Sequence, residues 1–176
     1  MNEFERREEE SYSLARYQSL AVLIWGPGDP GENGDDEARQ RYAKRCLIRE
    51  VLREHFPRST IRFSEEIKKR NSFTTQLDQE RNDAYNADAV IILGMSRGTD
   101  LELDHLIVHS WFRKKVWLLI PQQRLASPGL ADEVYKLIPE NQRSGFTPEE
   151  YERSDVAKVM SVNALDAVAN TKLTGY

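Results

Sequence analysis

The chain has 176 residues, which is enough for one domain with a full hydrophobic core and too few for two ordinary domains. It has 25 Lys and Arg residues and 29 Asp and Glu residues, which gives a net charge of -4, so it lacks the basic excess of a nucleic-acid-binding protein. A single cysteine excludes a disulfide framework, and no apolar run approaches the ~20 residues of a membrane span. We therefore expect a cytoplasmic protein without a nucleic-acid or membrane partner.

The N-terminal region predicts a charged arm followed by a strand and a glycine-rich loop. Residues 1–18 are dominated by charged side chains and predict a solvated arm or helix, whereas the apolar run at 19–25 predicts a buried strand. The loop at 26–34 holds four glycines and two prolines, which excludes regular structure. Such a loop commonly binds the phosphate or ribose of a nucleotide, because glycine lets backbone amides approach the ligand. It matches neither the dinucleotide fingerprint nor the Walker loop, so a plain surface connection fits equally well.

A helix, a short strand and a second helix are predicted next. The helix covers 37–55, is capped by one of the two aspartates that precede it, and ends before Pro57. The short strand covers 59–64, and the second helix runs from about residue 74 to residue 86. The single cysteine falls on the apolar stripe of the first helix, so we expect it to pack rather than react. That stripe comprises Tyr42, Cys46, Leu47, Val51 and Leu52.

The most informative stretch runs from Asp88 to Glu102. Its apolar run at 89–93 is too short for a helix and predicts a strand that is buried on both faces. A turn of glycine and serine residues follows, after which Thr99 or Asp100 can cap a helix. Glu102 therefore lies in the first turns of a helix that starts where a parallel strand ends. Ligands of open α/β sheets bind at that edge of the sheet.

The hydrophobic pattern that predicts strands and helices is less clear toward the C-terminus. The helix should continue to the basic residues 113–115, and a fourth buried strand is predicted at 116–120. A helix over 130–138, an irregular segment at 139–147 and a last helical stretch from Pro148 follow, so no fifth strand is evident.

The alternation of strands and helices predicts a three-layer α/β fold. Its parallel sheet of four to five strands would have a flavodoxin-like or related order with right-handed crossovers. We expect residues 19–176 to form a single nucleotide-binding domain, in which 19–121 supply the core and 122–176 a less regular helical C-terminal part.

The stretch around Glu102 resembles the nucleoside deoxyribosyltransferase family. That family has a buried strand, a Gly-Thr turn, a Glu-Leu pair that opens a helix, and a lysine before the next strand. The corresponding residues here are Gly98, Thr99, Glu102, Leu103 and Lys115. The same order of elements, with a glutamate opening the helix after the third strand, also resembles the Toll/interleukin receptor (TIR) domains that cleave NAD. Both resemblances cover about residues 19–121.

The resemblance implies that Glu102 is the catalytic carboxylate of an N-glycosidase. Breaking the bond between an anomeric carbon and a base passes through an oxocarbenium-like state, which a carboxylate can stabilise or attack. NAD or a related nucleotide would be the substrate rather than a cofactor, and its nicotinamide would leave as a neutral base. The likeness to TIR domains further implies a role in defence. A Glu102 that only caps its own helix is the alternative.

Further site residues are predicted because they lie at strand ends or in the adjoining turns. Trp25 and Phe63 could stack on a base or could equally belong to the core, and Ser96 could bond a ribose hydroxyl. Since the carboxyl ends of parallel strands share one edge, these residues should border one cleft with Glu102. The predicted set is Trp25, Gly26, Pro27, Gly28, Phe63, Ser64, Glu65, Ser96, Gly98 and Thr99.

Alternatives remain open for the chemistry and the partners. Ser96 stands where the transferases have an aspartate, which favours hydrolysis or binding alone over deoxyribosyl transfer. His105 and His109 have the spacing of a helical metal pair, but no third ligand has a recognisable spacing, so we predict no metal. A non-catalytic module that senses a nucleotide or assembles with like domains is the alternative function. In either case we expect a nucleotide ligand and a homo-oligomer or a partner protein.

Overall fold

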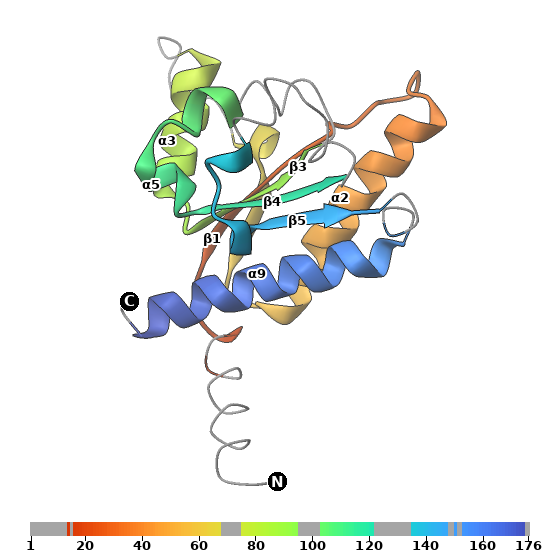
Figure 1. Cartoon of the computed structure of the whole chain (residues 1–176). Helices are drawn as coiled ribbons and strands as arrows, with labels where there is room; N and C mark the ends of the chain where they lie inside the picture. The colour runs from red at the N-terminus through yellow and green to blue at the C-terminus, as the bar shows by residue number, and fades with distance from the viewer. Residues whose placement is uncertain are drawn as a thin grey trace, which may run out of the picture.

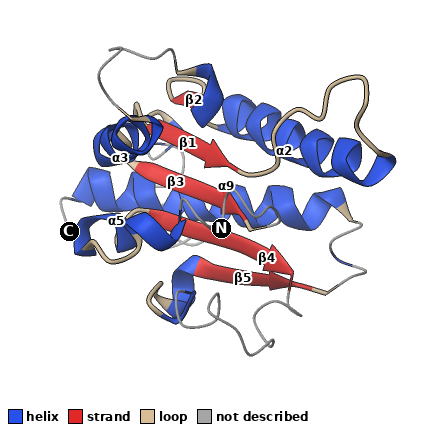
Figure 2. Ribbon diagram, turned by 90° about the horizontal axis from the view of Figure 1, so that it is seen from above, coloured by secondary structure: helices blue, strands red, loops and turns tan. Residues whose placement is uncertain are grey.

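The structure, a computed structural model, contains one all-parallel sheet of five strands in the order β2-β1-β3-β4-β5 (Figures 1 and 2). This is the flavodoxin-like strand order, so the predicted α/β architecture is confirmed. The described residues are 14, 16–67, 75–94, 103–121, 135–147, 150 and 153–174. The strands are β1 (Ala21–Trp25), β2 (Thr60–Phe63), β3 (Ala89–Leu93), β4 (Val116–Pro121) and β5 (Arg143–Phe146).

Helices cover both faces of the sheet and so form three layers. The helices are α2 (Asp36–His55), α3 (Gln76–Asn86), α5 (Ser110–Arg113) and α9 (Ser154–Thr174), with 3-10 turns η1 (Ser64–Glu66) and η2 (Glu140–Gln142). One buried cluster joins one face of the sheet to α2 and α9, and a second joins the other face to α3 and α5. None of the described helices combines the length and apolar character needed to cross a bilayer.

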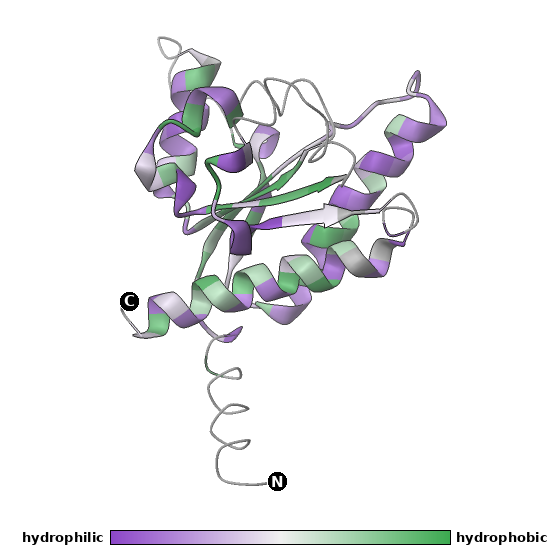
Figure 3. Ribbon diagram, viewed as in Figure 1, coloured by the Kyte–Doolittle hydropathy of each residue, from purple (hydrophilic) through white to green (hydrophobic). Residues whose placement is uncertain are grey.

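The central strands are hydrophobic throughout, as Figure 3 shows, because helices cover them on both sides. All five residues of β3 are buried, and alternate residues of β1, β3 and β4 contribute to the two clusters in turn. The edge strand β2 instead alternates exposed and buried residues. The predicted strands at 19–25, 59–64, 89–93 and 116–120 are confirmed to within two residues at each end.

Helix α2 begins where predicted, and its cap is Asp35, whose carboxylate accepts a hydrogen bond of 2.7 Å from the amide of Ala38. The predicted apolar stripe is only partly correct. Leu47 and Val51 are half-buried, whereas Arg45 and Lys44 are buried together with Ile48 and Leu52. The predicted packing of Cys46 in this helix is confirmed, since it is half-buried against the first cluster.

The helix predicted to run on to residues 113–115 is interrupted. Residues 103–106 are helical, residues 107–109 are not, and α5 then begins at Ser110 with His109 in an extended conformation. Arg113 holds this break by donating hydrogen bonds to the carbonyls of Ile107 and Val108, at 3.0 and 3.2 Å. His105 and His109 therefore do not share one helical face, and that prediction is wrong.

The C-terminal third differs most from the sequence expectation. The predicted irregular segment contains β5, which pairs in parallel with β4. Gln142 anchors the start of β5 by donating to the carbonyls of Lys114 and Val116, at 3.3 and 3.0 Å. The last helix, α9, begins at Ser154, and Glu150 within the predicted helical stretch from Pro148 is also helical, whereas residues 148–149 and 151–152 lie outside the described residues. Residues 1–13, in the predicted arm, and 122–134, which include most of a predicted helix, lie outside the described residues.

Candidate functional site

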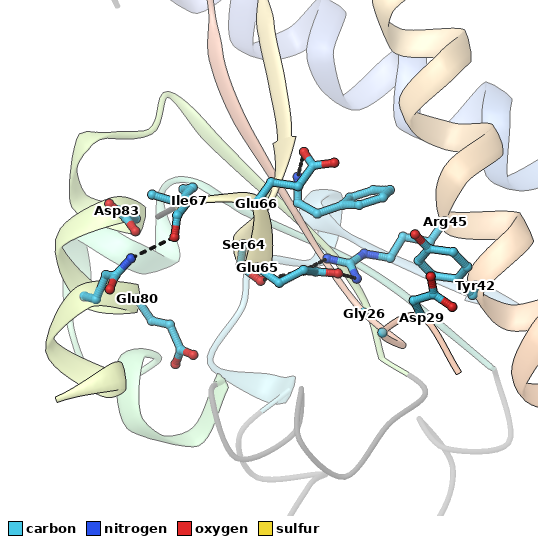
Figure 4. Close-up of a pocket in the computed structure, with 13 residues that line it drawn as sticks. Gly26, Asp29, Tyr42, Arg45, Ser64, Glu65, Glu66, Ile67, Glu80 and Asp83 are labelled. Atoms are coloured by element: carbon cyan, nitrogen blue, oxygen red, sulfur yellow. Dashed lines mark hydrogen bonds and ion pairs between the residues drawn. The ribbon is translucent and has the colours of Figure 1, made fainter. Parts of the chain in front are cut away.

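A cavity of about 820 Å³ lies at the carboxyl edge of the sheet, beyond the ends of β1 and β2 (Figure 4). Four segments line it: the loop after β1, the start of α2, the end of β2 with η1, and α3. Because α2 and α3 cover opposite faces of the sheet, the cavity lies between the two helical layers. Its lining residues are Gly26, Gly28, Asp29, Tyr42, Arg45, Phe63, Ser64, Glu65, Glu66, Ile67, Gln79, Glu80 and Asp83.

Five residues that were predicted from the strand ends line this cavity together: Gly26, Gly28, Phe63, Ser64 and Glu65. Pro27 stands between two of them and contributes its backbone carbonyl to the same region. Ser96, Gly98, Thr99 and Glu102 lie outside the described residues.

Trp25 does not belong to the cavity, contrary to prediction. It is fully buried in the opposite cluster, where its ring stacks on Phe112 with 5.7 Å between the ring centres. The reason is the alternation of side chains along β1, which turns the last residue toward α3 and α5. Its indole nitrogen has no hydrogen-bond partner among the described residues.

Phe63 lines the cavity wall but is a core aromatic rather than a stacking platform. Only 1% of the residue is exposed, and the guanidinium groups of Arg45 and Arg49 lie 4.1 and 4.0 Å from its ring centre. These are cation–π distances. Of the two roles that the sequence leaves open for this ring, stacking on a base and packing in the core, its burial agrees with the second.

Arg45 connects the separate walls of the cavity. Its guanidinium pairs with both carboxylate oxygens of Glu65, at 2.6 and 2.7 Å. The same two nitrogens donate to the carbonyls of Ile24 and Pro27, at 2.6 and 3.2 Å. Figure 4 shows the Arg45 and Glu65 side chains pointing toward each other, with dashed lines marking the bonds between them.

Gly26 is required by the close packing of the first loop. A Cβ atom at this position would lie 3.1 Å from the Cβ of Leu93, the last residue of β3. The ends of β1 and β3 therefore meet in contact. The next glycine, Gly28, has open space around it.

The described walls are acidic. Asp29, Glu65, Glu66, Glu80 and Asp83 line the cavity, and the one basic residue among the described lining residues is Arg45, whose charge Glu65 neutralises. Figure 4 shows Glu80 and Asp83 of α3 on the side opposite Arg45 and Tyr42. The amino end of α2 already accommodates the carboxylate of Asp35. The described walls therefore suit hydroxyl groups better than a phosphate.

Two titratable groups in the wall have shifted pKa values. Partial burial acts to raise the pKa of Glu65, but hydrogen bonds from Arg45 and the backbone, together with the arginine charge, bring it below its ordinary value. Glu65 is thus ionised at neutral pH and can only accept hydrogen bonds. Burial and a hydrogen bond with Cys46 raise the pKa of Tyr42, which keeps its hydroxyl proton.

Sequence reasoning missed Arg45 and the α3 wall. A signal for Arg45 was present, since it precedes Ile48 and Leu52 by three and seven residues and so occupies a core-facing position of the helix. An arginine on an apolar face is rarely buried unless it is paired. The acidic residues of α3 carry no such signal, because acidic side chains on a helix are usually solvated.

The described residues contain no group of three or more His, Cys, Asp or Glu side chains that could hold a metal ion. Comparisons of the chain with protein-family models and with curated proteins found no match.

Proposed function

We propose that this protein is an N-glycosidase of TIR-like or deoxyribosyltransferase-like kind, which cleaves the base–sugar bond of NAD or a related nucleotide. The observation that carries the proposal is the cavity at the carboxyl edge, where Gly26, Gly28, Ser64 and Glu65 come together. Gly26 contacts the end of β3, from which the chain runs on toward Glu102. Such an edge is where open α/β sheets bind ligands.

The proposed reaction is a hydrolysis in which Glu102 stabilises the developing positive charge on the anomeric carbon or attacks it. The bond between that carbon and the base nitrogen breaks, and its electron pair leaves with the base. With NAD as substrate, the cationic nicotinamide ring becomes neutral on leaving, so no strong general acid is needed. Water then adds to the anomeric carbon and releases a proton.

The acidic walls favour one orientation of the substrate. Carboxylates accept hydrogen bonds from ribose hydroxyls and repel phosphate oxygens. The hydroxyl-bearing ribosyl part would therefore face Glu65 and Asp83, and the phosphates would lie away from the described walls. The Asp83 carboxylate lines the cavity, and none of its hydrogen-bond or ion-pair partners is among the described residues.

The TIR resemblance supports a role in defence through loss of NAD or through a nucleotide signal, in a cytoplasmic protein that acts as a homo-oligomer or with a partner protein. The TIR resemblance rests on the order of elements and on Glu102, which opens the helix after the third strand, whereas Lys115 belongs to the resemblance to the transferases. Lys115 donates to the carbonyls of Tyr85 and Ala87, at 2.6 and 2.7 Å, and so ties the end of α3 to the start of β4.

The test is chromatography of NAD, nucleotides and deoxynucleosides after incubation with the purified protein. We expect nicotinamide and ADP-ribose from NAD, or free base from a related nucleotide. Base exchange between deoxynucleosides without net hydrolysis would instead identify a transferase. Binding without release of base from any of these compounds would identify a nucleotide-sensing module and overturn the proposal.

A further inference from the structure

Arg45 is a deeply buried charge at the edge of a binding cavity. Only 1% of it is exposed. Burying a guanidinium requires compensation by an opposite charge and hydrogen bonds, because water no longer solvates it. The compensating partners are distributed over two segments far apart in the sequence, the loop after β1 and the end of β2.

In the first of these segments, Arg45 holds the part of the loop that directly follows β1. Gly26 and Gly28 lack side chains that could anchor the loop, and the described hydrogen bond that links this part of the loop to α2 runs from Arg45 to the carbonyl of Pro27, at 3.2 Å. A second bond, to the carbonyl of Ile24 at 2.6 Å, fixes the same guanidinium at the end of β1. The arginine thereby holds the loop wall against α2.

The second segment presents the carboxylate that faces the cavity. The side chain of Glu65 is 48% exposed, so it could adopt other orientations in water. The two parallel bonds from Arg45 restrict it to one orientation, with the Ser64 hydroxyl donating to Oε2 at 3.3 Å. A lysine could not replace this arrangement, because it lacks the planar fork that serves four acceptors at fixed angles.

We propose that Arg45 is a positioning residue that sets the loop after β1 and the Glu65 carboxylate at a fixed separation, and so determines how the cavity binds the ribosyl part of its ligand. Arg45 itself contacts no ligand, since its two terminal nitrogens are occupied by protein acceptors. That the cavity binds a ribosyl group rests on the proposed function, whereas the role of Arg45 in fixing the loop after β1 does not.

The chain offers a matched control in Arg49. It lies one turn further along α2, its guanidinium is 4.0 Å from the same Phe63 ring, and it also pairs with a glutamate, Glu66. It makes no described hydrogen bond to the loop after β1, and it does not line the cavity. Arg49→Lys therefore removes a guanidinium group from the same helix and from the same Phe63 ring, and it leaves the contacts of Arg45 with the loop and with Glu65 in place.

The experiment combines two measurements on Arg45→Lys and Arg49→Lys. Hydrogen exchange without ligand should show the amides of residues 26–29 exchanging at least tenfold faster in Arg45→Lys and at the wild-type rate in Arg49→Lys. Base release from NAD should show KM raised about tenfold in Arg45→Lys with kcat within threefold, and both constants unchanged in Arg49→Lys.

The outcomes separate the two proposals. Wild-type exchange at residues 26–29 in Arg45→Lys would overturn the positioning role whether or not the protein cleaves NAD. Equal exchange changes in the two variants would also overturn it, because a general loosening of α2 would then explain the result. If Arg45→Lys does not fold, Glu65→Gln can be used instead, because it weakens the Arg45–Glu65 ion pair by removing the charge of its exposed member. An unchanged KM for NAD in Glu65→Gln would overturn the proposal. If the wild-type protein releases no base, the proposed function fails, while the exchange result still decides the role of Arg45.

Discussion

The two edges of the sheet each carry an ion pair that joins distant parts of the chain, but the two pairs differ in environment. At the carboxyl edge, Arg45 is buried and Glu65 is half-exposed toward a cavity. At the amino edge, Lys172 of α9 pairs with Asp88 at 3.0 Å, with 42% and 30% of the side chains exposed. Asp88 also accepts a hydrogen bond of 2.8 Å from the amide of Ala21.

The difference shows how similar charges serve different purposes. At the amino edge, Lys172 also donates to the carbonyl of Ser19, so the groups there satisfy one another and hold α9 to the start of the sheet. At the carboxyl edge, Arg45 satisfies two backbone carbonyls and Glu65, and several carboxylates line a cavity. The amino-edge pair also borders a cavity, of about 440 Å³ against about 820 Å³ at the carboxyl edge. We infer that the amino-edge pair holds the fold together and that the carboxyl-edge cavity, at the ends of the strands, is the candidate ligand site.

The largest expected effect on stability is at the buried arginine. Arg45→Met should lower the free energy of unfolding by about 2–3 kcal/mol, because two buried carbonyls lose their donor while Glu65 regains water. Urea denaturation measures this loss. An effect below about 1 kcal/mol would mean that the two edges carry equivalent ion pairs and would remove the basis for the comparison.

A smaller effect should distinguish the two glycines of the first loop. Gly26→Ala should cost about 1–2 kcal/mol, because its Cβ would approach the Cβ of Leu93 to 3.1 Å. Gly28→Ala should leave the free energy of unfolding within about 0.5 kcal/mol, since nothing lies within 4 Å of its Cβ. Equal urea midpoints for the two variants would show that the ends of β1 and β3 are not closely packed.

Removing the amino-edge pair should have a smaller effect still. Lys172→Met should cost about 0.5 kcal/mol, because both charges are partly solvated and Asp88 retains the Ala21 amide. Urea denaturation of this variant in parallel with Arg45→Met compares the two edges directly. If Lys172→Met lost as much free energy of unfolding as Arg45→Met, the more buried ion pair at the carboxyl edge would not be the more important one for stability, contrary to our account.

The smallest expected effect is a pH dependence from Glu65. Its pKa is lower in the folded protein than its ordinary value, so it stabilises the fold above that ordinary value, and this contribution is lost as the pH falls through the lowered folded value. Unfolding of Glu65→Gln followed below about pH 5 should therefore show a shallower loss of stability than the wild type. Parallel curves for the two proteins would show that Glu65 is not held ionised by Arg45.

The hydrophobic strands could be predicted from the sequence because burial on both faces leaves a continuous apolar run, as in β3. Strand β5 could not, since Arg-Ser-Gly-Phe has no such run and owes its conformation to pairing with β4 and to Gln142. The break at residues 107–109 was hidden for a similar reason, because Arg113 holds it through contacts with the backbone.

The site was predictable where it depended on strand ends alone. Gly26, Ser64 and Glu65 follow strands that end at one edge, so their proximity is a consequence of parallel topology. The position of Trp25 could not be predicted in the same way, because side chains alternate between the two faces of β1. An error of one residue in the alternation places the side chain on the opposite face of the sheet. The helix α3 reaches the cavity only through tertiary packing.

The most direct test of the proposed function is the rate of base release by Glu102→Gln compared with the wild-type protein. Gln keeps the size of the side chain but cannot stabilise a developing cation with a full negative charge, so turnover should fall by about 10²–10³-fold. The urea midpoint should hardly change, because a neutral amide near a helix start loses only ~0.3–1 kcal/mol of dipole interaction. Release of base from NAD by Glu102→Gln at the wild-type rate would contradict the proposal at its central residue.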